Sequence, residues 1–434
     1  MTVEVAAANV RLQRPGVGRI EPAMVAAFGW MAVALLPLLI YVRGFGDVYL
    51  STLATAFVVR LALRRDLAPI RAFYAWPALL YWGWLVAATA PSGDLHRIGV
   101  SLAWGRVAVT VVALGSWVLA SGRFRGPLLV ASAFAAVWIG VEVWMQALRG
   151  RSVSGFLPAP AGEFTGPFRR PRAGAYLVRI VWPPLAVACG RLSQMGPGGL
   201  VACTLLLAVF LATSFVIGQR MPLVHAALGV GILALALPAL RHPAVVGAAA
   251  VIAVAALAAT VFPAAFDRQV TQFAAILAGF PDSHYGQILR RALAMAEWAP
   301  WRGLGADGFR TFCADPRFFV GWVGQSDGGG SAMCVPHAHN SYLDALVNGG
   351  VPGLVLFALA AAGWLMSAAQ RLLPQPEPLR LGLFISVLVP LWPAGSVHAF
   401  TSQPTSTLWA LMTGWAIAEA TRARTKDSAR RSDA

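Results

Sequence analysis

The sequence predicts an all-α protein that crosses a membrane many times. Of its 434 residues 58% are hydrophobic and only 12% are charged, and the mean hydropathy is +0.66. A soluble domain carries about twice that charged share. The apolar residues also gather in blocks of about 20, the length that spans a bilayer as a helix. These observations exclude a soluble enzyme, a disordered chain and a secreted disulfide scaffold.

The apolar blocks predict twelve membrane helices, each justified by its length and its near-absence of charge. The blocks are 22–42, 45–63, 70–90, 98–120, 127–148, 173–190, 198–217, 222–240, 243–262, 341–369, 379–398 and 405–421. The first block is long enough to remain as an anchor, so we expect no removable signal peptide. An even number of spans places both termini on one side.

Basic residues indicate which side is cytoplasmic. They follow the second, fourth and last helices: Arg64, Arg65, Arg71, Arg123, Arg125, Arg422, Arg424, Lys426, Arg430 and Arg431. All of these positions share a side with the termini, so 1–21 and the tail 422–434 are predicted to be cytoplasmic. Helices one to nine then occupy 22–262 and helices ten to twelve occupy 341–421. The connections 149–172 and 263–340 face outward.

The net charge of +16 rests almost entirely on arginine, since Lys426 is the single lysine. In a membrane protein this excess mostly records charge in the loops. We therefore do not interpret it as a sign of nucleic-acid binding. Four cysteines are too few for a disulfide scaffold.

The outward segment 263–340 is too long for a simple turn, and connections of this length usually have a function. It contains a predicted amphipathic helix, Tyr285–Trp298. The apolar face of this helix comprises Ile288, Leu289, Ala292, Met295 and Ala296. Arginines also crowd the outward segments, at 149, 151, 169, 170, 172, 290, 291, 302, 310 and 317. Arg220 stands apart because it lies in a short turn at the membrane edge, where a guanidinium needs a partner or an anionic ligand.

The most informative motif joins the second outward segment to the tenth helix. It contains His339 and Asn340, then nine residues, Gly350, two residues and Gly353. This spacing resembles the signature of the O-antigen ligase and polymerase superfamily. Together with about twelve spans and the long loop just before it, the resemblance is specific.

Two further stretches resemble the same superfamily. Residues 213–222 (TSFVIGQRMP) resemble its Ser-Arg element, with Gln219 in place of the serine, so only Arg220 carries over. Residues 290–310 resemble a helix followed by Pro and Gly-x-Gly, in which Arg290 or Arg291 is the counterpart of a family arginine. The resemblance covers roughly 213–363. It implies a membrane glycosyltransferase architecture of the GT-C-like type.

The resemblance implies transfer of a glycan from undecaprenyl diphosphate to a sugar hydroxyl. The leaving diphosphate is strongly anionic. The outward carboxylates are few and scattered, whereas a hard metal such as Mg²⁺ normally wants one or two of them. Arginine supplies permanently charged forks that match phosphate oxygens. We therefore expect a metal-independent reaction without a cofactor, in which Arg220, Arg290 and Arg291 hold the diphosphate.

His339 is the candidate general base, because histidine titrates near neutral pH. Attack in line with the leaving group would invert the anomeric centre. Nearby arginines are expected to lower the pKa of His339. The alternative is a histidine that only helps to begin the tenth helix. His337 and His339 could instead bind a transition metal, but no third ligand is evident.

The remaining candidates have secondary or structural roles. Residues that could also contact substrate are His337, Asn340, Arg169 and Arg170. Asn340 also suits an N-cap of the tenth helix. Asp344 either orients His339 or complements the helix N-terminus. Gly350 and Gly353 would allow close helix packing. Cys313 and Cys334 would form a disulfide if the loop lies in the oxidising periplasm.

The sequence thus predicts an O-antigen ligase of the bacterial inner membrane with a periplasmic active site. Its expected partners are undecaprenyl-diphosphate-linked O-antigen, lipid A-core oligosaccharide and membrane lipid. An O-antigen polymerase of the same superfamily is the near alternative, and a lipid-linked glycan transporter is the alternative from another class. A lateral opening near the seventh to tenth helices would admit the polyprenyl tail.

Overall fold

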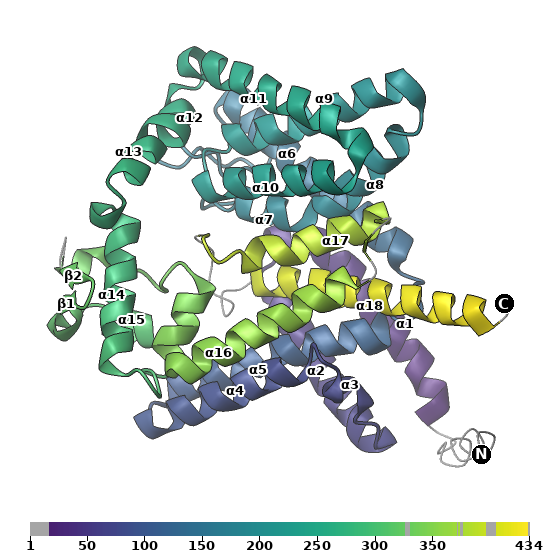
Figure 1. Ribbon diagram of the computed structural model, residues 1–434, viewed down its shortest axis with the longest axis vertical. Coiled ribbons are helices and arrows are strands. Elements are labelled where there is room, and N and C mark those ends of the chain that lie inside the picture. Colours follow the sequence, from purple (N-terminus) through teal and green to yellow (C-terminus); the bar gives the residue numbers. More distant parts are fainter. Residues whose placement is uncertain (1–16, 326–329, 371, 374–375, 396–404, 433–434) are drawn as a thin grey trace.

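The structure is a computed structural model that describes residues 17–325, 330–370, 372–373, 376–395 and 405–432 (Figure 1). Over these residues it is an all-α protein with one small β-hairpin. The helices before the long outward segment are α1 (Val17–Tyr41), α2 (Gly44–Arg64), α3 (Ala68–Arg71), α4 (Trp76–Thr89), α5 (Leu95–Ala113), α6 (Arg125–Arg149), α7 (Ala173–Ile180), α8 (Trp182–Leu192), α9 (Gly196–Val216), α10 (Arg220–Ala236) and α11 (Arg241–Val261).

The outward segment and the C-terminal part contain the remaining elements. The helices are α12 (Pro263–Phe266), α13 (Gln272–Ala278), α14 (His284–Trp298), α15 (Gly308–Phe312), α16 (Ser341–Ala369), α17 (Pro378–Leu388) and α18 (Thr405–Ser432). The strands β1 (Val320–Gly321) and β2 (Gly324–Gln325) pair antiparallel. Two π-helical segments are 114–118 and 267–271, and short 3-10 turns cover 90–92, 238–240, 280–282, 316–318, 330–333 and 389–391.

The described residues contain seven helices that are long and apolar enough to cross a membrane. The bent pair α7 and α8, which meet at 52°, raises this number to eight if it counts as one span. A polytopic membrane protein is therefore confirmed, whereas the predicted twelve spans are not. Each of the other four apolar blocks does form a helix. However, α4, α10 and α17 have only 14, 17 and 11 residues, and α18 is more polar.

Helices from distant parts of the sequence pack side by side in the bundle. The most extensive contacts are those of α9 with α11, α16 with α4, and α17 with α8. Trp182 is fully buried where α7 bends into α8, and an added Cβ at Gly382 of α17 would lie 2.4 Å from its carbonyl oxygen. Such close approach lets short and bent helices satisfy their backbone groups against neighbours.

The segment 263–340, which the sequence predicts to face outward, forms a folded unit at one end of the bundle, and we name it the outward unit (Figure 1). The start of α1 and the end of α18 lie at the opposite end, where Arg422 pairs with Glu419 and Arg125 lies 3.9 Å from the same carboxylate. The outward unit has its own apolar core, which includes Ile288, Met295 and Phe309. This core fixes the segment that leads into α16.

Helix α14 begins one residue before its predicted start because Ser283 caps it. The Ser283 hydroxyl accepts a hydrogen bond from the Gly286 backbone N–H, as an N-cap serine commonly does. The predicted helix over 285–298 is therefore confirmed. His398, the last residue of the predicted apolar block 379–398, lies outside the described residues.

Candidate functional site

Three cavities meet around the loop 336–340, which precedes α16. We name them the arginine cavity (about 430 Å³), the apolar cavity (about 570 Å³) and the inner cavity (about 180 Å³). His337 lines the arginine cavity, whereas His339 lines both of the others. The two imidazole rings lie 4.5 Å apart between their centroids. The His-x-His motif therefore stands at the junction of all three cavities.

The backbone of this loop fixes the relative position of the two imidazoles. His339 has φ +57°, a left-handed conformation that a non-glycine residue rarely adopts. Its N–H donates to Nδ1 of His337 at 3.1 Å, so Nε2 carries the proton when His337 is neutral. Asp344 accepts from the Ala338 N–H at 2.8 Å. A strained backbone held by several bonds is typical of a functional site.

Asn340 fixes the position of His339 from the other side. Its Oδ1 accepts from the N–H groups of Tyr342 (2.9 Å) and Leu343 (3.2 Å), which caps α16. Its Nδ2 donates to the carbonyl oxygens of Pro393 (2.7 Å) and Gly395 (3.4 Å). Both ends of the amide are thus engaged within the protein. This geometry gives Asn340 a positioning role.

The apolar cavity is a hydrophobic groove with one polar end. Side chains from α13, α14, α16 and the turn after α17 form its walls, and they include Phe273, Ile276, Leu277, Phe280, Leu289, Leu346, Leu354 and Trp392. Arg220 and His339 lie at its polar end. The shape suits a molecule with a long apolar part and a charged head.

The inner cavity shares Arg220, Tyr285 and His339 with the apolar cavity. Nε of Arg220 donates to the Arg268 carbonyl oxygen at 3.1 Å, and Nη2 donates to Oε1 of Gln272 at 2.5 Å. Within the described chain, no carboxylate is ion-paired with Arg220.

Arg268, which also lines this cavity, forms an ion pair with Glu163. Its Nη2 lies 2.8 Å from Oε1 of Glu163. Burial raises the pKa of Glu163, although the positive charges of Arg268 and then Arg220 oppose that shift. A cation without its own carboxylate therefore faces His339, as an anion site requires.

The pKa of His339 is lowered to about 4, so its imidazole is neutral at pH 7. The principal cause is burial, and the second is repulsion from His284. The direction agrees with the sequence prediction, but the cause does not, because the shift comes from burial and an imidazole instead of arginines. The ring of Tyr285 lies edge-on at 5.9 Å from that of His339.

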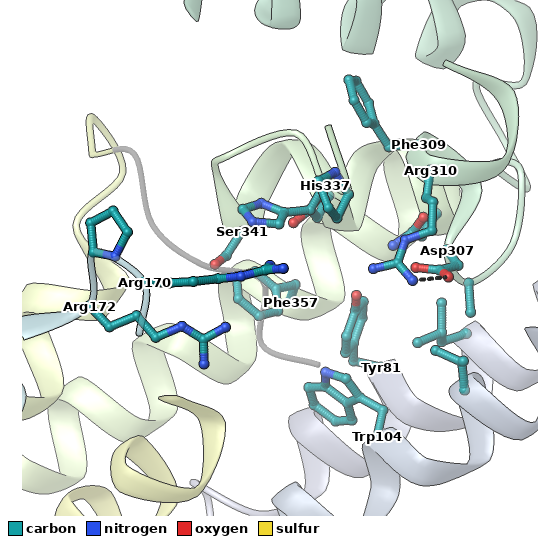
Figure 2. A pocket seen from close by; sticks show the side chains of 17 residues that line it. Tyr81, Trp104, Arg170, Arg172, Asp307, Phe309, Arg310, His337, Ser341 and Phe357 are labelled. Carbon is teal, nitrogen blue, oxygen red and sulfur yellow. Dashed lines mark ion pairs between the residues drawn. The ribbon is translucent and has the colours of Figure 1, made fainter. Parts of the chain in front are cut away.

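The arginine cavity lies on the other side of the His-x-His motif (Figure 2). Arg170 extends across it toward Phe357, and Arg172 lies beside it. Arg310 lies at the far side, with Nη1 at 3.5 Å from Oδ2 of Asp307.

The floor of this cavity is aromatic. The rings of Tyr81 and Trp104 pack edge to face at 4.8 Å between their centroids. The cavity thus combines basic side chains with aromatic surface, which suits an anionic sugar.

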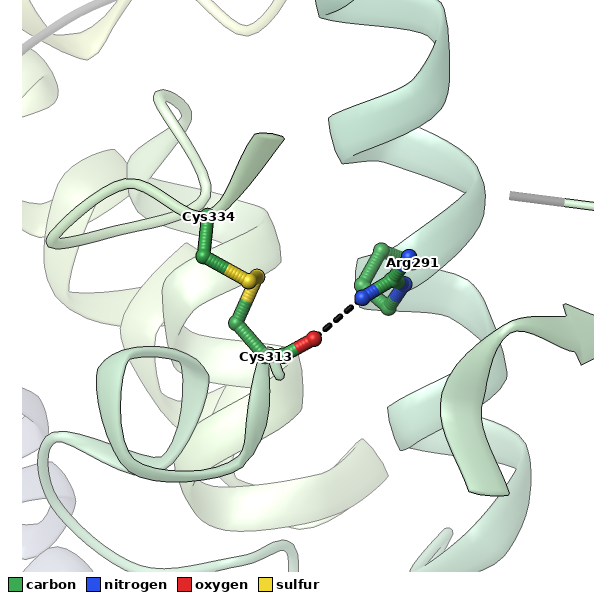
Figure 3. Close-up of a disulfide and its surroundings, with 3 residues drawn as sticks. All are labelled: Arg291, Cys313 and Cys334. Atoms are coloured by element: carbon green, nitrogen blue, oxygen red, sulfur yellow. Dashed lines mark hydrogen bonds between the residues drawn. A yellow bond between two sulfur atoms is a disulfide. The ribbon is translucent and has the colours of Figure 1, made fainter. Parts of the chain in front are cut away.

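The remaining predicted arginines do not line these cavities. Arg291 is fully buried, stacks on Phe319 at 4.0 Å and donates to the carbonyl oxygen of Cys313 (Figure 3). Arg290 donates to the carbonyl oxygen of Gln325 at 3.0 Å. Arg169 is exposed. The position of Arg291 supports a structural role, since its guanidinium is enclosed by the outward unit.

A disulfide joins Cys313 and Cys334, the pair that the sequence predicted, with their Cα atoms 5.6 Å apart (Figure 3). Both cysteines belong to the small core of the outward unit, Cys313 as a buried residue and Cys334 packed against it. The bridge ties the segment before α16 to the helix α15. It therefore supports the loop that carries both histidines.

The two glycines of the signature are structural. Gly350 interrupts α16 with φ +65°, and an added Cβ there would lie 2.5 Å from the Pro300 carbonyl oxygen. That oxygen accepts a hydrogen bond from the Val351 N–H at 2.7 Å. An added Cβ at Gly353 would lie 2.9 Å from the Ala345 carbonyl oxygen. Gly350 thus lets α16 dock against the loop after α14, whereas Gly353 allows close packing within the kinked α16.

Some cavity residues were not assigned a role from the sequence. Tyr285 lines two of the cavities, and Arg179 and His225 line the inner one. Arg179 is recognisable in the sequence as a charge inside an apolar block, whereas His225 gives no such signal. In the part of the chain that the structure describes, no three His, Cys, Asp or Glu residues are grouped to hold a metal ion.

Comparison with known proteins agrees with the signature. Residues 202–358 match the sequence profile of the family described as O-Antigen ligase. No curated protein matches the chain. The matched range contains Arg220, the outward unit, His339 and both signature glycines, which are the features that the sequence resemblance used. The predicted resemblance to the O-antigen ligase family is therefore borne out over residues 202–358.

Proposed function

We propose that this protein is an O-antigen ligase that transfers a glycan from undecaprenyl diphosphate to a sugar hydroxyl of lipid A-core. The observation that carries the proposal is the His-x-His loop between different cavities, with His339 on the side of the apolar groove and His337 on the side of the arginine cavity. A transferase for two large substrates needs such a junction, because both must reach one reacting centre.

The apolar cavity is the proposed donor site. Its hydrophobic walls suit a polyprenyl chain, and Arg220 at its polar end suits the diphosphate. The groove lies along α13, α14 and α16, so the tail would enter between the outward unit and the bundle. This extends the lateral opening that we expected near residues 198–262 and 341–369 to the helices of the outward unit.

The proposed chemistry is a single inverting displacement. The acceptor oxygen attacks the anomeric carbon, and the bond from that carbon to the phosphate oxygen breaks. The electron pair leaves with undecaprenyl diphosphate, whose charge Arg220 stabilises. His339 takes the hydroxyl proton, since it is neutral before donor binding. A bound diphosphate would raise the pKa of His339 toward a value suited to accept that proton.

The arginine cavity is the proposed acceptor site. It offers Arg170, Arg172 and Arg310 to anionic groups and an aromatic floor to sugar rings. His337 marks its boundary with the reacting centre. Arg290 and Arg291 remain further candidates for the diphosphate by family resemblance alone, because neither lines the proposed donor site.

The proposed location is the bacterial inner membrane, with the outward unit in the periplasm and both termini in the cytoplasm. The disulfide supports this orientation, because disulfides persist in the oxidising periplasm and are rare in the cytosol. The proposed reaction requires no metal or cofactor, since arginine supplies the charge that stabilises the leaving group.

A deletion of the gene in its native host tests the proposal. Lipopolysaccharide and lipid-linked glycans would be measured in parallel. A ligase predicts that lipid A-core loses all O-antigen while polymer accumulates on the lipid carrier. Single repeat units on the core without long chains would identify a polymerase. Accumulation of unpolymerised lipid-linked units at the cytoplasmic face would identify a transporter. Unchanged amounts of lipopolysaccharide and of lipid-linked glycan would contradict all three functions: ligase, polymerase and transporter.

A further inference from the structure

Arg179 and His225 are buried polar groups that point into the inner cavity without an assigned role. Their side chains are 5% and 4% exposed. Arg179 lies in α7, and His225 lies in α10, one and a half turns beyond Arg220. The two helices converge on this cavity, which the proposed reaction uses only at Arg220 and His339.

Both groups leave hydrogen-bonding capacity unused. Nη1 of Arg179 donates to the Ala175 carbonyl oxygen of its own helix. Among the described residues, Nε of Arg179 and Nε2 of His225 are buried and meet no hydrogen-bond partner. A buried charge that lacks its partner costs several kcal/mol, so such groups usually serve a ligand.

The charge of the inner cavity is also unbalanced. Three guanidiniums line it, those of Arg179, Arg220 and Arg268, and they face the single carboxylate of Glu163. Glu163 is ion-paired with Arg268 at 2.8 Å, so Arg179 and Arg220 remain to bind a ligand. The cavity is small, about 180 Å³, which suits a compact anion instead of a sugar chain.

The turn after α17, which lines the apolar cavity, packs against His225. An added Cβ at Gly395 would lie 3.0 Å from Nε2 of His225, so glycine allows this close approach. In the same turn, the Gly395 carbonyl oxygen accepts a hydrogen bond from Nδ2 of Asn340. The element that positions His339 therefore also covers His225.

We propose that Arg179 and His225 form the deep part of the diphosphate site, continuous with Arg220. One phosphoryl group then lies between Arg220 and Arg179, and His225 donates Nε2–H to a phosphate oxygen. The polyprenyl chain leaves along the apolar cavity, and the glycan faces His339. This inference rests on the proposed function and adds the residues that hold the leaving group.

Lipid-binding measurements on the full-length protein in nanodiscs test this inference. The probes are undecaprenyl diphosphate, undecaprenyl monophosphate and undecaprenol. The variants are Arg179→Gln, Arg179→Lys and His225→Gln, together with Arg220→Gln at the proposed donor site. The control is Arg106→Gln, because Arg106 pairs with Asp47 at 2.5 Å and lines none of the cavities.

We expect Arg179→Gln to weaken diphosphate binding roughly tenfold or more and His225→Gln to weaken it severalfold, with undecaprenol affinity unchanged. Arg179→Lys should lose less, because it keeps the charge. If Arg179→Gln fails to fold, Arg179→Lys and His225→Gln carry the test. Equal losses for diphosphate and undecaprenol would show a structural role and overturn the inference.

The failure of this inference and the failure of the proposed function give different results. If Arg220→Gln weakens diphosphate binding while Arg179→Gln and His225→Gln do not, the proposed donor site stands and the deep site is wrong. If the wild-type protein binds all three lipids equally well, the diphosphate site is absent and both proposals fall.

Discussion

Substitution of Arg220 by glutamine should slow glycan transfer by about two orders of magnitude. A guanidinium has five N–H donors. Two of them are engaged with the Arg268 carbonyl oxygen and with Gln272, so three remain for a ligand. Each charge-assisted hydrogen bond contributes about 1.5–3 kcal/mol. Loss of one or two such bonds removes about 3 kcal/mol of stabilisation, which is roughly a hundredfold in rate.

The assay is transfer of labelled glycan from undecaprenyl diphosphate to purified lipid A-core by the purified protein. kcat/KM would be measured for wild type, Arg220→Gln and Arg220→Lys. Lysine keeps the charge but not the fork, so its loss should be intermediate. Arg317→Gln is the matched control, because Arg317 is exposed in the outward unit and pairs with Asp315 at 2.6 Å. Equal rates for Arg220→Gln and Arg317→Gln, in folded protein, would refute the reasoning.

Three further predictions concern the pH dependence and the scaffold of the site. Because the pKa of His339 is lowered to about 4, kcat/KM should stay level from pH 6 to 8. It should fall only as the pH approaches 4 and the base becomes protonated. A fall centred on the ordinary histidine pKa of about 6.5 would contradict this prediction. The Cys313→Ala/Cys334→Ala double variant lacks the disulfide that closes a loop over a separation of 21 residues. The free energy of unfolding of the outward unit, measured with denaturant, should therefore fall by about 3 kcal/mol. An unchanged unfolding transition would contradict this prediction. Gly350→Ala should lower the free energy of unfolding by at least about 2 kcal/mol, because φ is +65° and the added Cβ would meet the Pro300 carbonyl oxygen. Gly140→Ala is the control, because its added Cβ meets open space and should leave the melting temperature unchanged. Equal melting temperatures for both variants would show that the break in α16 is not required.

The helices were largely predictable because apolar blocks report burial in a membrane or a core. The number of spans was not predictable, because a block such as 173–190 reads as one span although the chain bends by 52° between α7 and α8. In the described part of block 379–398, which ends at residue 395, the helical elements are the 11 residues of α17 and a short 3-10 turn. Block length alone does not show where a helix bends or ends against its neighbours.

The candidate site was partly predictable from local patterns. Asn340 caps α16 as its position before the apolar block indicated. The burial of Arg291 could have been predicted from helical spacing. It lies on the same face of α14 as the buried residues Ile288, Ala292 and Met295. Its neighbour Arg290 points elsewhere for the same reason.

The inner cavity could not be predicted because it depends on contacts between distant segments. Arg179 in α7 and His225 in α10 are 46 residues apart, and both come from helices whose own sequences read as apolar. Nor does the motif show that His337 and His339 face different cavities. That separation follows from the left-handed backbone at His339, which no local pattern announced.

The most direct test of the account is His339→Gln in the native host, with lipopolysaccharide and lipid-linked glycan measured together. The account predicts normal amounts of the protein in the membrane, lipid A-core without O-antigen, and polymer retained on the lipid carrier. Normal lipopolysaccharide in that variant would show that His339 does not accept the proton, and it would contradict the central claim.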